Sequence, residues 1–509
     1  MNKPLTIPSR AAGILLPISS LPSPYGIGTL GKASYDWIDF LSIAGQQYWQ
    51  VLPLGPTSYG DSPYQSFSAF AGNPYFIDLK LLRKDGLLDK GDYAELDWGT
   101  DPYRVNYGTI YRHRESVLRK AMARFSDEEG LRRFCEENAF WLEDYALYMA
   151  IKATQGHRSW TEWEPSLRYR RPEALTASRK ALAEDIRFYC VVQYLFFRQW
   201  TALRAYAQRK GVQIIGDIPI YVAMDSADVW ARPHLFQLDE KGLPSAVAGC
   251  PPDSFSATGQ LWGNPLYAWE VMEKDGFRWW IERCKASFAL YDVLRIDHFR
   301  GLESYYAIPY GDATAQNGKW MKGPGRSFLQ AIREGVPDAR IIAEDLGFLT
   351  DEVRELQRQS GYPGMKVLLF AFDTREDSDY LPYNYTANSI VYTGTHDNDT
   401  ILGWSRNAPW DDVQHAMAFV DVQSKKQLPR ALIRLALSSC SSLAVVPLQD
   451  WLELDDEARM NIPSTLGGNN WRWRVHPDLL TDRLADEIRS LTRLYGRLSP
   501  LPSTNISLK

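Results

Sequence analysis

Short apolar runs, rich in β-branched residues, recur eight times along this 509-residue chain and end near Gly, Pro, Asp or His. Several runs are continuous rather than alternating, which is typical of strands in a parallel sheet that is covered on both faces. The runs therefore predict a parallel sheet in an α/β fold. They occupy residues 12–17, 48–53, 212–219, 291–297, 340–344, 364–370, 389–396 and 442–447.

Helical patterns lie between these runs. Residues 35–41 place apolar side chains at helical spacing, and Thr350 can cap a helix over 351–360 that ends at Gly361. Eight strands that alternate with helices are the arrangement of a (β/α)8 TIM barrel. A doubly wound open sheet has the same alternation and remains an alternative.

The spacing of the runs is uneven, which indicates insertions. Many more residues separate the second and third runs than one helix needs, and helical patterns occur there at 106–123 and 139–154. We therefore expect a mostly helical inserted subdomain at about 60–205. Each insertion follows the C-terminal end of a strand, the face where barrel enzymes keep their active sites. Two smaller insertions that shape the cleft are expected at about 224–270 and 300–327.

The remainder of the chain after the eighth run is short. It is long enough for the helix that closes a barrel but too short for a separate β-sandwich as well. We therefore expect a single catalytic barrel over 1–509 with no C-terminal β-domain.

Charge and cysteine content exclude several classes of function. The chain has 57 Lys and Arg against 62 Asp and Glu, so it lacks the basic face that nucleic-acid binding requires. Its five cysteines are widely spaced with no CxxC, which indicates neither a disulfide framework nor a zinc site. The apolar stretch 11–18 is broken by Pro17 and has no small-x-small cleavage site, so it is predicted to be a buried strand rather than a signal peptide. These features favour a cytoplasmic protein without a membrane partner.

Carboxyl groups stand at the ends of four of the predicted strands. One such residue alone is more often a helix cap or a salt-bridge partner. In a barrel, however, all four ends lie on one face, and like charges that crowd there cost stability unless a function retains them. Two carboxyl groups around a scissile bond are the minimum for glycosidic chemistry. The four residues are Asp217, Asp297, Glu344 and Asp397.

The neighbours of these carboxyl groups suggest how each is tuned. Arg295 and Asp297 point to the same side of a strand, so the guanidinium is expected to lower the pKa of Asp297 and keep it ionised, as a nucleophile requires. Glu344 directly follows an apolar strand and could be desolvated enough to hold a proton as general acid. His396 precedes Asp397 and adds an imidazole beside the third carboxyl group.

Other chemistries have weaker support. The chain contains no GxxxxGK[ST], GxSxG or HExxH motif and no GxGxxG between a strand and a helix. A Mg²⁺ or Zn²⁺ site is an alternative, because residues 396–399 read His-Asp-Asn-Asp. Arg295 beside Asp297 counts against it, since a fixed cation repels a metal. We therefore expect no metal and no cofactor.

Seven stretches of the sequence, taken in their order along the chain, are specific for one protein family. The sequence resembles the amylomaltase (4-α-glucanotransferase) family, a relative of the α-amylase superfamily, across essentially its whole length. The resemblance rests on residues 49–56 (WQVLPLGP), 59–66 (YGDSPYQS), 216–222 (GDIPIYV), 259–265 (GQLWGNP), 295–301 (RIDHFRG), 343–347 (AEDLG) and 395–398 (THDN).

The resemblance implies a barrel with insertions and assigns roles to the strand-end residues. It implies that Asp297 is the nucleophile, Glu344 the general acid/base and Asp397 the stabiliser of the transition state. Further residues are implied to hold hydroxyl groups, to contact neighbouring sugars or to line the cleft: Arg295, His298, His396, Asp217, Trp262, Gln260, Asn470, Tyr64 and Ser62. Tyr59 and Tyr107 match positions where the family can bind glucan outside the active site.

Two features depart from related proteins. Hydrolytic α-amylases usually end the third strand with an Asn-His pair tied to calcium, whereas residues 218–222 here read Ile-Pro-Ile-Tyr-Val. In the loop 251–256, relatives often place two aromatic residues side by side, and this chain has Ser254 before Phe255. The second departure affects which glucan lengths are preferred. We expect Phe255, with Tyr64, to hold the acceptor sugar.

The implied reaction transfers α-1,4-glucan segments from a donor to a sugar acceptor by a retaining double displacement, and cyclic glucans are a possible product. Retention requires the carboxyl groups of Asp297 and Glu344 to lie about 5–5.5 Å apart. Two alternatives stay open at this point. One is a retaining α-glucan hydrolase of the same superfamily, and the other is a glucan-binding protein without catalytic activity.

Overall fold

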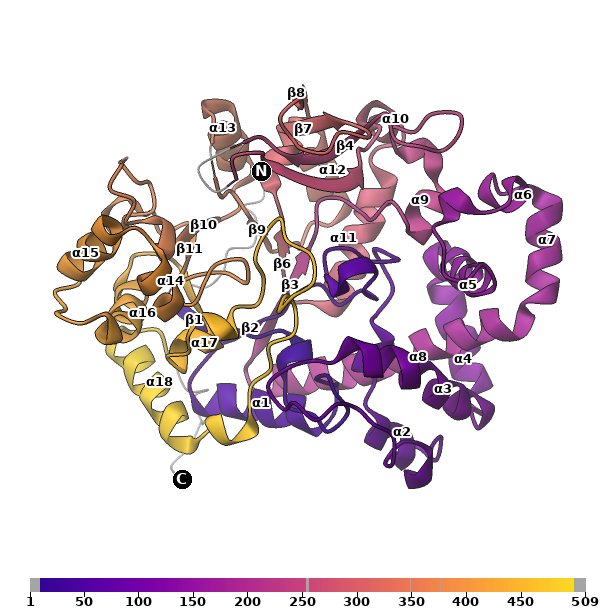
Figure 1. Ribbon diagram of the computed structural model, residues 1–509, viewed down its shortest axis with the longest axis horizontal. Coiled ribbons are helices and arrows are strands. Elements are labelled where there is room, and N and C mark those ends of the chain that lie inside the picture. Colours follow the sequence, from indigo (N-terminus) through magenta and orange to yellow (C-terminus); the bar gives the residue numbers. More distant parts are fainter. Residues whose placement is uncertain (1–9, 253–255, 348, 376, 499–509) are drawn as a thin grey trace, which may run out of the picture.

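A computed structural model describes residues 10–252, 256–347, 349–375 and 377–498. Eight parallel strands close into a barrel in the order β1-β12-β11-β10-β9-β6-β3-β2 (Figure 1). Each predicted run overlaps one barrel strand, so the (β/α)8 prediction is confirmed and the open-sheet alternative is wrong. The strands are β1 (Ala11–Leu15), β2 (Tyr48–Gln50), β3 (Gln213–Ile218), β6 (Val293–Ile296), β9 (Ile341–Ala343), β10 (Gly364–Val367), β11 (Ser389–Tyr392) and β12 (Leu443–Pro447).

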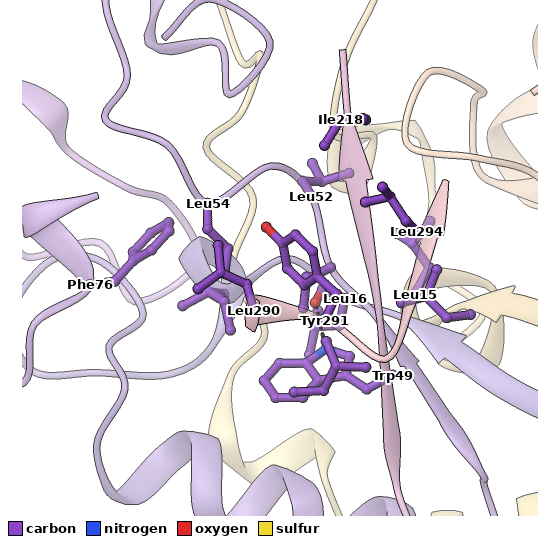
Figure 2. Close-up of a cluster of buried hydrophobic side chains, with 14 of the residues drawn as sticks. Leu15, Leu16, Trp49, Leu52, Leu54, Phe76, Ile218, Leu290, Tyr291 and Leu294 are labelled. Carbon is purple, nitrogen blue, oxygen red and sulfur yellow. Dashed lines mark hydrogen bonds between the residues drawn. The ribbon is translucent and has the colours of Figure 1, made fainter. Parts of the chain in front are cut away.

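Burial on both faces explains the continuous apolar runs. All residues of β1, β6, β11 and β12 are buried, because barrel strands have packed side chains inside and helices outside. Figure 2 shows part of this core, where Leu15, Trp49 and Leu294 from three strands lie close together. The stretch that could pass for a signal peptide contributes β1 to this core.

The predicted helix ends are confirmed at two places. Helix α1 (Lys32–Ile43) follows the first strand. The Thr350 hydroxyl accepts the N–H of Val353 at the start of α13 (Asp351–Ser360), and Gly361 ends this helix at φ 72°. Glycine adopts this left-handed conformation without the steric penalty of a Cβ atom.

The residues between β2 and β3 form helices, which surround the right side of the barrel in Figure 1. The predicted segments 106–123 and 139–154 correspond to α3 and α5. The longest helix, α8, leads back into β3. These helices are α2 (Leu79–Lys84), α3 (Tyr107–Ala123), α4 (Glu128–Glu137), α5 (Ala139–Thr154), α6 (Pro165–Arg168), α7 (Pro172–Ala181) and α8 (Ala183–Arg209).

A second sheet was not predicted from the sequence. It is antiparallel, has the order β5-β4-β7-β8 and stands beside the barrel at the top of Figure 1. Its strands come from the two smaller insertions, and a register irregularity interrupts the pairing of β4 with β5. The four strands differ in burial, from mostly buried β4 and β7 to fully exposed β8, so they lack the apolar runs that identify the barrel strands. They are β4 (Ala246–Cys250), β5 (Gln260–Pro265), β7 (Ser304–Pro309) and β8 (Lys319–Lys322).

The remaining helices complete the outer ring. After β12, the described residues form helices and turns, with no further strand up to residue 498. No helix among the described residues combines the length and the apolar content that crossing a bilayer needs. The helices are α9 (Ala227–Ala231), α10 (Trp269–Lys274), α11 (Arg278–Leu290), α12 (Gly325–Gly335), α14 (Ile401–Asn407), α15 (Trp410–Phe419), α16 (Leu428–Ser438), α17 (Leu448–Trp451) and α18 (Asp482–Leu494).

Candidate active site

Barrel register brings the predicted strand-end residues together around Arg295. Asp217 on β3 pairs directly with Arg295 on β6, so both side chains point to the same side of the sheet. The Arg295 Nη1 atom donates to Asp217 Oδ2 at 2.6 Å and lies 3.0 Å from Asp297 Oδ1. Its Nη2 atom lies 4.0 Å from Glu344 Oε2. One buried guanidinium therefore contacts or faces three carboxyl groups.

Backbone hydrogen bonds fix the two residues that follow β6 and β9. The N–H of Asp297 donates to the Ile218 carbonyl at 3.0 Å, and the N–H of Glu344 donates to the Ile296 carbonyl at 3.0 Å. The parallel ladder thus continues one residue beyond each strand. The Asp297 side chain is 27% exposed and the Glu344 side chain 10%, so both reach the mouth of the barrel.

His298 adopts a left-handed conformation with φ 49°. This turn aims its backbone N–H at Glu344 Oε2, 2.6 Å away, while the N–H of Leu346 donates to Glu344 Oε1 at 2.7 Å. Both carboxylate oxygens of Glu344 are therefore oriented by backbone donors. A left-handed non-glycine residue costs free energy, and such positions cluster at functional sites.

Burial dominates the electrostatics of this site. Burial raises the pKa of Asp297 well above its ordinary value; Arg295 opposes this shift, and Glu344, Asp217 and Asp397 add to it. Arg295 does lower the pKa of Asp297, as expected, but its effect is too small to keep the pKa below the ordinary value. The barrel mouth excludes water and gathers other carboxyl groups, which outweighs one cation. Burial also raises the pKa of Glu344, as predicted.

His396 and Tyr64 form a layer beside Asp397. The Tyr64 ring stacks on His396 at 5.0 Å between centroids, and its hydroxyl donates to Asp217 Oδ2 at 2.7 Å. The His396 Nε2 atom lies 3.4 Å from Asp397 Oδ1. Burial lowers the pKa of His396, which favours the neutral imidazole. The Asp397 side chain is 47% exposed and faces the cleft.

Trp262 and Gln260 lie on β5 of the second sheet. The Trp262 ring meets the His298 ring edge to face at 4.8 Å, and its indole N–H donates to Gln260 Oε1 at 3.1 Å. Burial lowers the pKa of His298 to about 3, so the ring is neutral at physiological pH. The unpredicted sheet thus places two predicted site residues beside the barrel mouth.

Other predicted residues have structural contacts of their own. The Asn470 amide accepts the N–H of Ile462 at 3.0 Å and donates to the Thr465 hydroxyl at 2.9 Å, so it holds its own loop. Ser62 accepts the N–H of Tyr64 at 3.2 Å. Their contacts with sugar stay predictions.

The expected second glucan site is not supported at Tyr107. This residue is buried, and its hydroxyl donates to the Trp471 carbonyl at 3.0 Å. Its ring therefore supports the loop of residues 461–471 and is not offered to solvent. Tyr59 begins a short 3-10 helix, Tyr59–Asp61, but its side chain lies outside the described part of the structure, as does Phe255.

Sequence reasoning missed Asn461 and Arg459. The Asn461 amide donates to Asp397 Oδ1 at 2.7 Å, and the Arg459 guanidinium donates to the Asp397 carbonyl at 2.7 Å. These two residues orient the carboxyl group from a loop that is distant in sequence. No motif marks them, because the contact exists only after the barrel closes. Within the described residues, no group of three His, Cys, Asp or Glu side chains is arranged to hold a metal ion.

Comparisons with known proteins agree with this geometry. A family model described as 4-alpha-glucanotransferase matches residues 16–481. A 4-alpha-glucanotransferase of Streptococcus pneumoniae is 50% identical over 495 residues, which cover 96% of this chain and 98% of the relative. One of Thermus thermophilus is 48% identical over 507 residues, covering 96% and 99%.

A solved structure gives the same result at the level of the fold. The amylomaltase from Streptococcus agalactiae in complex with acarbose superposes with a TM-score of 0.94 at 41% identity, covering 96% of this chain and all of that one. The two barrels therefore share their strand order and their insertions closely. The chain belongs to the 4-α-glucanotransferase family.

Proposed function

We propose that this protein transfers α-1,4-glucan segments between maltooligosaccharides by a retaining double displacement. One observation carries the proposal: Asp297 and Glu344 face the same guanidinium, and Asp397 stands at the same barrel mouth. Two carboxyl groups that flank one bond fit the retaining mechanism of glycoside chemistry. The acarbose bound by the Streptococcus agalactiae amylomaltase supports a glucan-like ligand.

In the first step, Glu344 protonates the glycosidic oxygen while Asp297 Oδ attacks the anomeric carbon. The C–O bond to the leaving sugar breaks as the bond to Asp297 forms, giving a covalent β-glycosyl enzyme. Burial raises the pKa of Glu344, which favours the protonated form that a general acid needs. Asp397 stabilises the positive charge that develops on the sugar ring.

In the second step, Glu344 acts as a base. It removes the proton from the 4-hydroxyl of an incoming glucan, whose oxygen displaces Asp297 and restores the α-linkage. Two inversions give net retention. Arg295 stays ionised throughout and stabilises the carboxylate that Asp297 regains as leaving group.

Neutral side chains fit the role of holding sugar hydroxyls. The imidazoles of His298 and His396 are uncharged at neutral pH because burial lowers the pKa of each. Each ring can donate one hydrogen bond and accept another. Trp262 and Tyr64 offer ring faces or edges near them, and aromatic surfaces pack well on the apolar face of a pyranose. Transfer rather than hydrolysis then depends on holding the acceptor while water is excluded.

Purified protein incubated with maltotriose tests the proposal. Product sizes and total reducing ends are followed together. A ladder of longer oligosaccharides plus glucose at constant reducing ends is the expected result. Rising reducing ends without a ladder would identify a hydrolase. No change in either quantity, from folded protein, would favour a glucan-binding protein without activity.

A further inference from the structure

A pocket lined mostly by buried residues lies next to Asp217, between β3, α11 and the loop that carries Tyr64. Its volume is about 50 Å³. Asp217 and Tyr64 line one part of it, and Arg283 and Ser287 of α11 line another. Apolar residues complete the wall, among them Leu54, Ile218, Leu290 and Tyr291, which lie near one another in Figure 2.

Two charged side chains that line this cavity each have one polar atom without a partner. Asp217 is 1% exposed, and its Oδ1 atom accepts no hydrogen bond from any described residue. Arg283 is 2% exposed, and its Nε atom donates none within the same described part of the chain. Leaving a buried charged group unsatisfied costs more than leaving a neutral one. Both atoms therefore need a partner that the described residues do not provide.

We infer that the cavity holds a cluster of ordered water molecules that joins Asp217 Oδ1 to Arg283 Nε, and that Arg283 is thereby a positioning residue for the reacting carboxyl groups. A buried water needs roughly 10–15 Å³ of such space, so the cavity has room for about three to five waters. Because Arg283 Nε–H can only donate and Asp217 Oδ1 accepts, the hydrogen bonds of the cluster run from Arg283 towards Asp217.

The cluster is directly linked to the reaction centre. Oδ2 of Asp217 accepts hydrogen bonds from Arg295 at 2.6 Å and from Tyr64 at 2.7 Å, which leaves the buried Oδ1 atom for the cluster. Arg295 in turn lies 3.0 Å from Asp297. The water cluster thus fixes the far side of the carboxyl group that orients Arg295, and Arg295 orients the nucleophile.

Water fits the site better than a cation. The Arg283 guanidinium stands over Trp279 and Trp280 at 5.4 and 4.8 Å and donates to the Pro219 carbonyl at 2.7 Å. This fixed charge would repel a metal ion. Asp228 is the other buried carboxyl group that faces Arg283, so the guanidinium also balances acid on this side of the barrel.

A high-resolution crystal structure of the free enzyme tests the cluster directly. We expect ordered waters within hydrogen-bond distance of Asp217 Oδ1 and of Arg283 Nε, connected to one another. A dry cavity, or waters that contact neither atom, would overturn the inference. This test is independent of the proposed reaction, so a protein inactive on maltotriose can still pass or fail it.

Kinetic variants test the positioning role, which rests on the proposed function. The groups that face Asp297 are Arg295, Glu344, Asp217 and Asp397. Removing the positive charge of Arg283 in Arg283→Gln should raise the pKa of the nucleophile Asp297 further. The acid limb of the kcat/KM profile should move up by about one pH unit, and Arg283→Lys should restore it. A purely structural role would lower the melting temperature and the amount of active enzyme without moving the limb.

Ser287→Val keeps the proposal testable if the Arg283 variants do not fold. The substitution adds apolar volume at the cavity wall and leaves every charged group in place. We expect fewer ordered waters and a kcat about 3–10-fold lower, with KM nearly unchanged, because positioning affects the reacting atoms more than ground-state binding. Displaced waters with an unchanged kcat would refute the positioning role.

Discussion

Arg295 is the residue on which the other site residues depend. Its guanidinium is 4% exposed and contacts Asp217 and Asp297, and Glu344 lies just beyond. The three acidic groups together exceed its single charge, so burial and mutual repulsion raise the pKa of Asp297 and Glu344. Asp297 and Glu344 therefore hold a proton more strongly than isolated carboxyl groups do. Because the two groups interact, each observed pKa describes the pair and not one residue alone.

Replacing the nucleophile should abolish turnover and spare the fold. In Asp297→Asn we expect activity on maltotriose to fall at least about a hundredfold, since an amide cannot form the glycosyl ester. The melting temperature should stay equal or rise, because the substitution removes one of the crowded carboxyl groups. Glu240→Gln, at an exposed position, is the matched control. Retention of more than about 1% of activity would mean that another group is the nucleophile.

The pH dependence of kcat/KM should reflect the proton that Asp297 and Glu344 share. The reactive form carries a proton on Glu344 and none on Asp297, so activity is lost as the pH rises and this proton leaves. Because burial raises the pKa of Glu344 above 4.5, the alkaline limb of kcat/KM should lie above that value. Glu344→Gln should remove the limb and lower kcat/KM for maltotriose by about 10²–10⁴.

A donor that needs no proton separates the acid role from binding. With α-maltosyl fluoride, whose leaving group departs as fluoride, the first turnover of Glu344→Gln should be slowed far less than with maltotriose, because only the second step still needs Glu344 as a base. The initial burst of fluoride release and the first-turnover release of glucose from maltotriose are compared in the same preparation. An equal loss of both first-turnover rates would contradict the assignment of Glu344 as general acid.

At the scale of elements, helix α8 fixes residues 72–78, which follow the loop that carries Tyr64. The Gln193 amide accepts the N–H of Gly72 at 2.7 Å and donates to the Gly72 carbonyl at 2.9 Å. Gln199, also on α8, accepts the N–H of Asp78 at 2.7 Å and donates to its carbonyl at 3.2 Å. Each buried glutamine thus forms the two backbone hydrogen bonds that a neighbouring strand would form. These bonds explain why Gln193 and Gln199 lie on the apolar face of α8.

Replacing this amide by an apolar side chain should cost stability. In Gln193→Leu, both backbone groups of Gly72 lose their buried partner, and we expect the free energy of unfolding to fall by about 2–5 kcal/mol. Urea denaturation followed by tryptophan fluorescence measures the change. Thr201→Leu, at an exposed position of the same helix, should change it by less than about 0.5 kcal/mol. Equal effects of the two substitutions would argue against a stabilising role of the hydrogen bonds between Gln193 and Gly72.

At the scale of the whole molecule, Arg497 ties the end of the described chain to the closure of the barrel. This buried side chain donates to the carbonyls of Ala11 at 2.9 Å, Leu437 at 2.7 Å and Ser439 and Ser441 at 3.0 Å each. Ala11 begins β1, and Ser441 stands just before β12. These are the first and the last barrel strands, so Arg497 supports the pairing that closes the barrel.

Loss of the Arg497 hydrogen bonds should lower the stability of the entire barrel. We expect Arg497→Met to lower the free energy of unfolding by at least about 3 kcal/mol, since four carbonyls lose a charged donor. Differential scanning calorimetry gives the change in melting temperature. Arg493→Met, at an exposed position on α18, serves as the control. An unchanged melting temperature in Arg497→Met would show that these contacts contribute nothing to closure.

The sequence by itself determined the eight barrel strands, the caps of α13 and the carboxyl groups at the strand ends. These features are local, because apolar periodicity and the polar residues that end it occur within a few positions of one another. The family resemblance added the roles of residues such as Asp397, which no local pattern distinguishes from a helix cap.

Only the tertiary structure decided the rest. It showed that the sheet closes, that a second sheet places Trp262 against His298, and that Asn461 holds Asp397. It also showed that burial outweighs the effect of Arg295 on the pKa of Asp297. Each of these properties depends on groups far apart in the chain that share one buried space. Electrostatic energies and pairing partners there are set by distance and solvent exclusion, which sequence spacing does not specify.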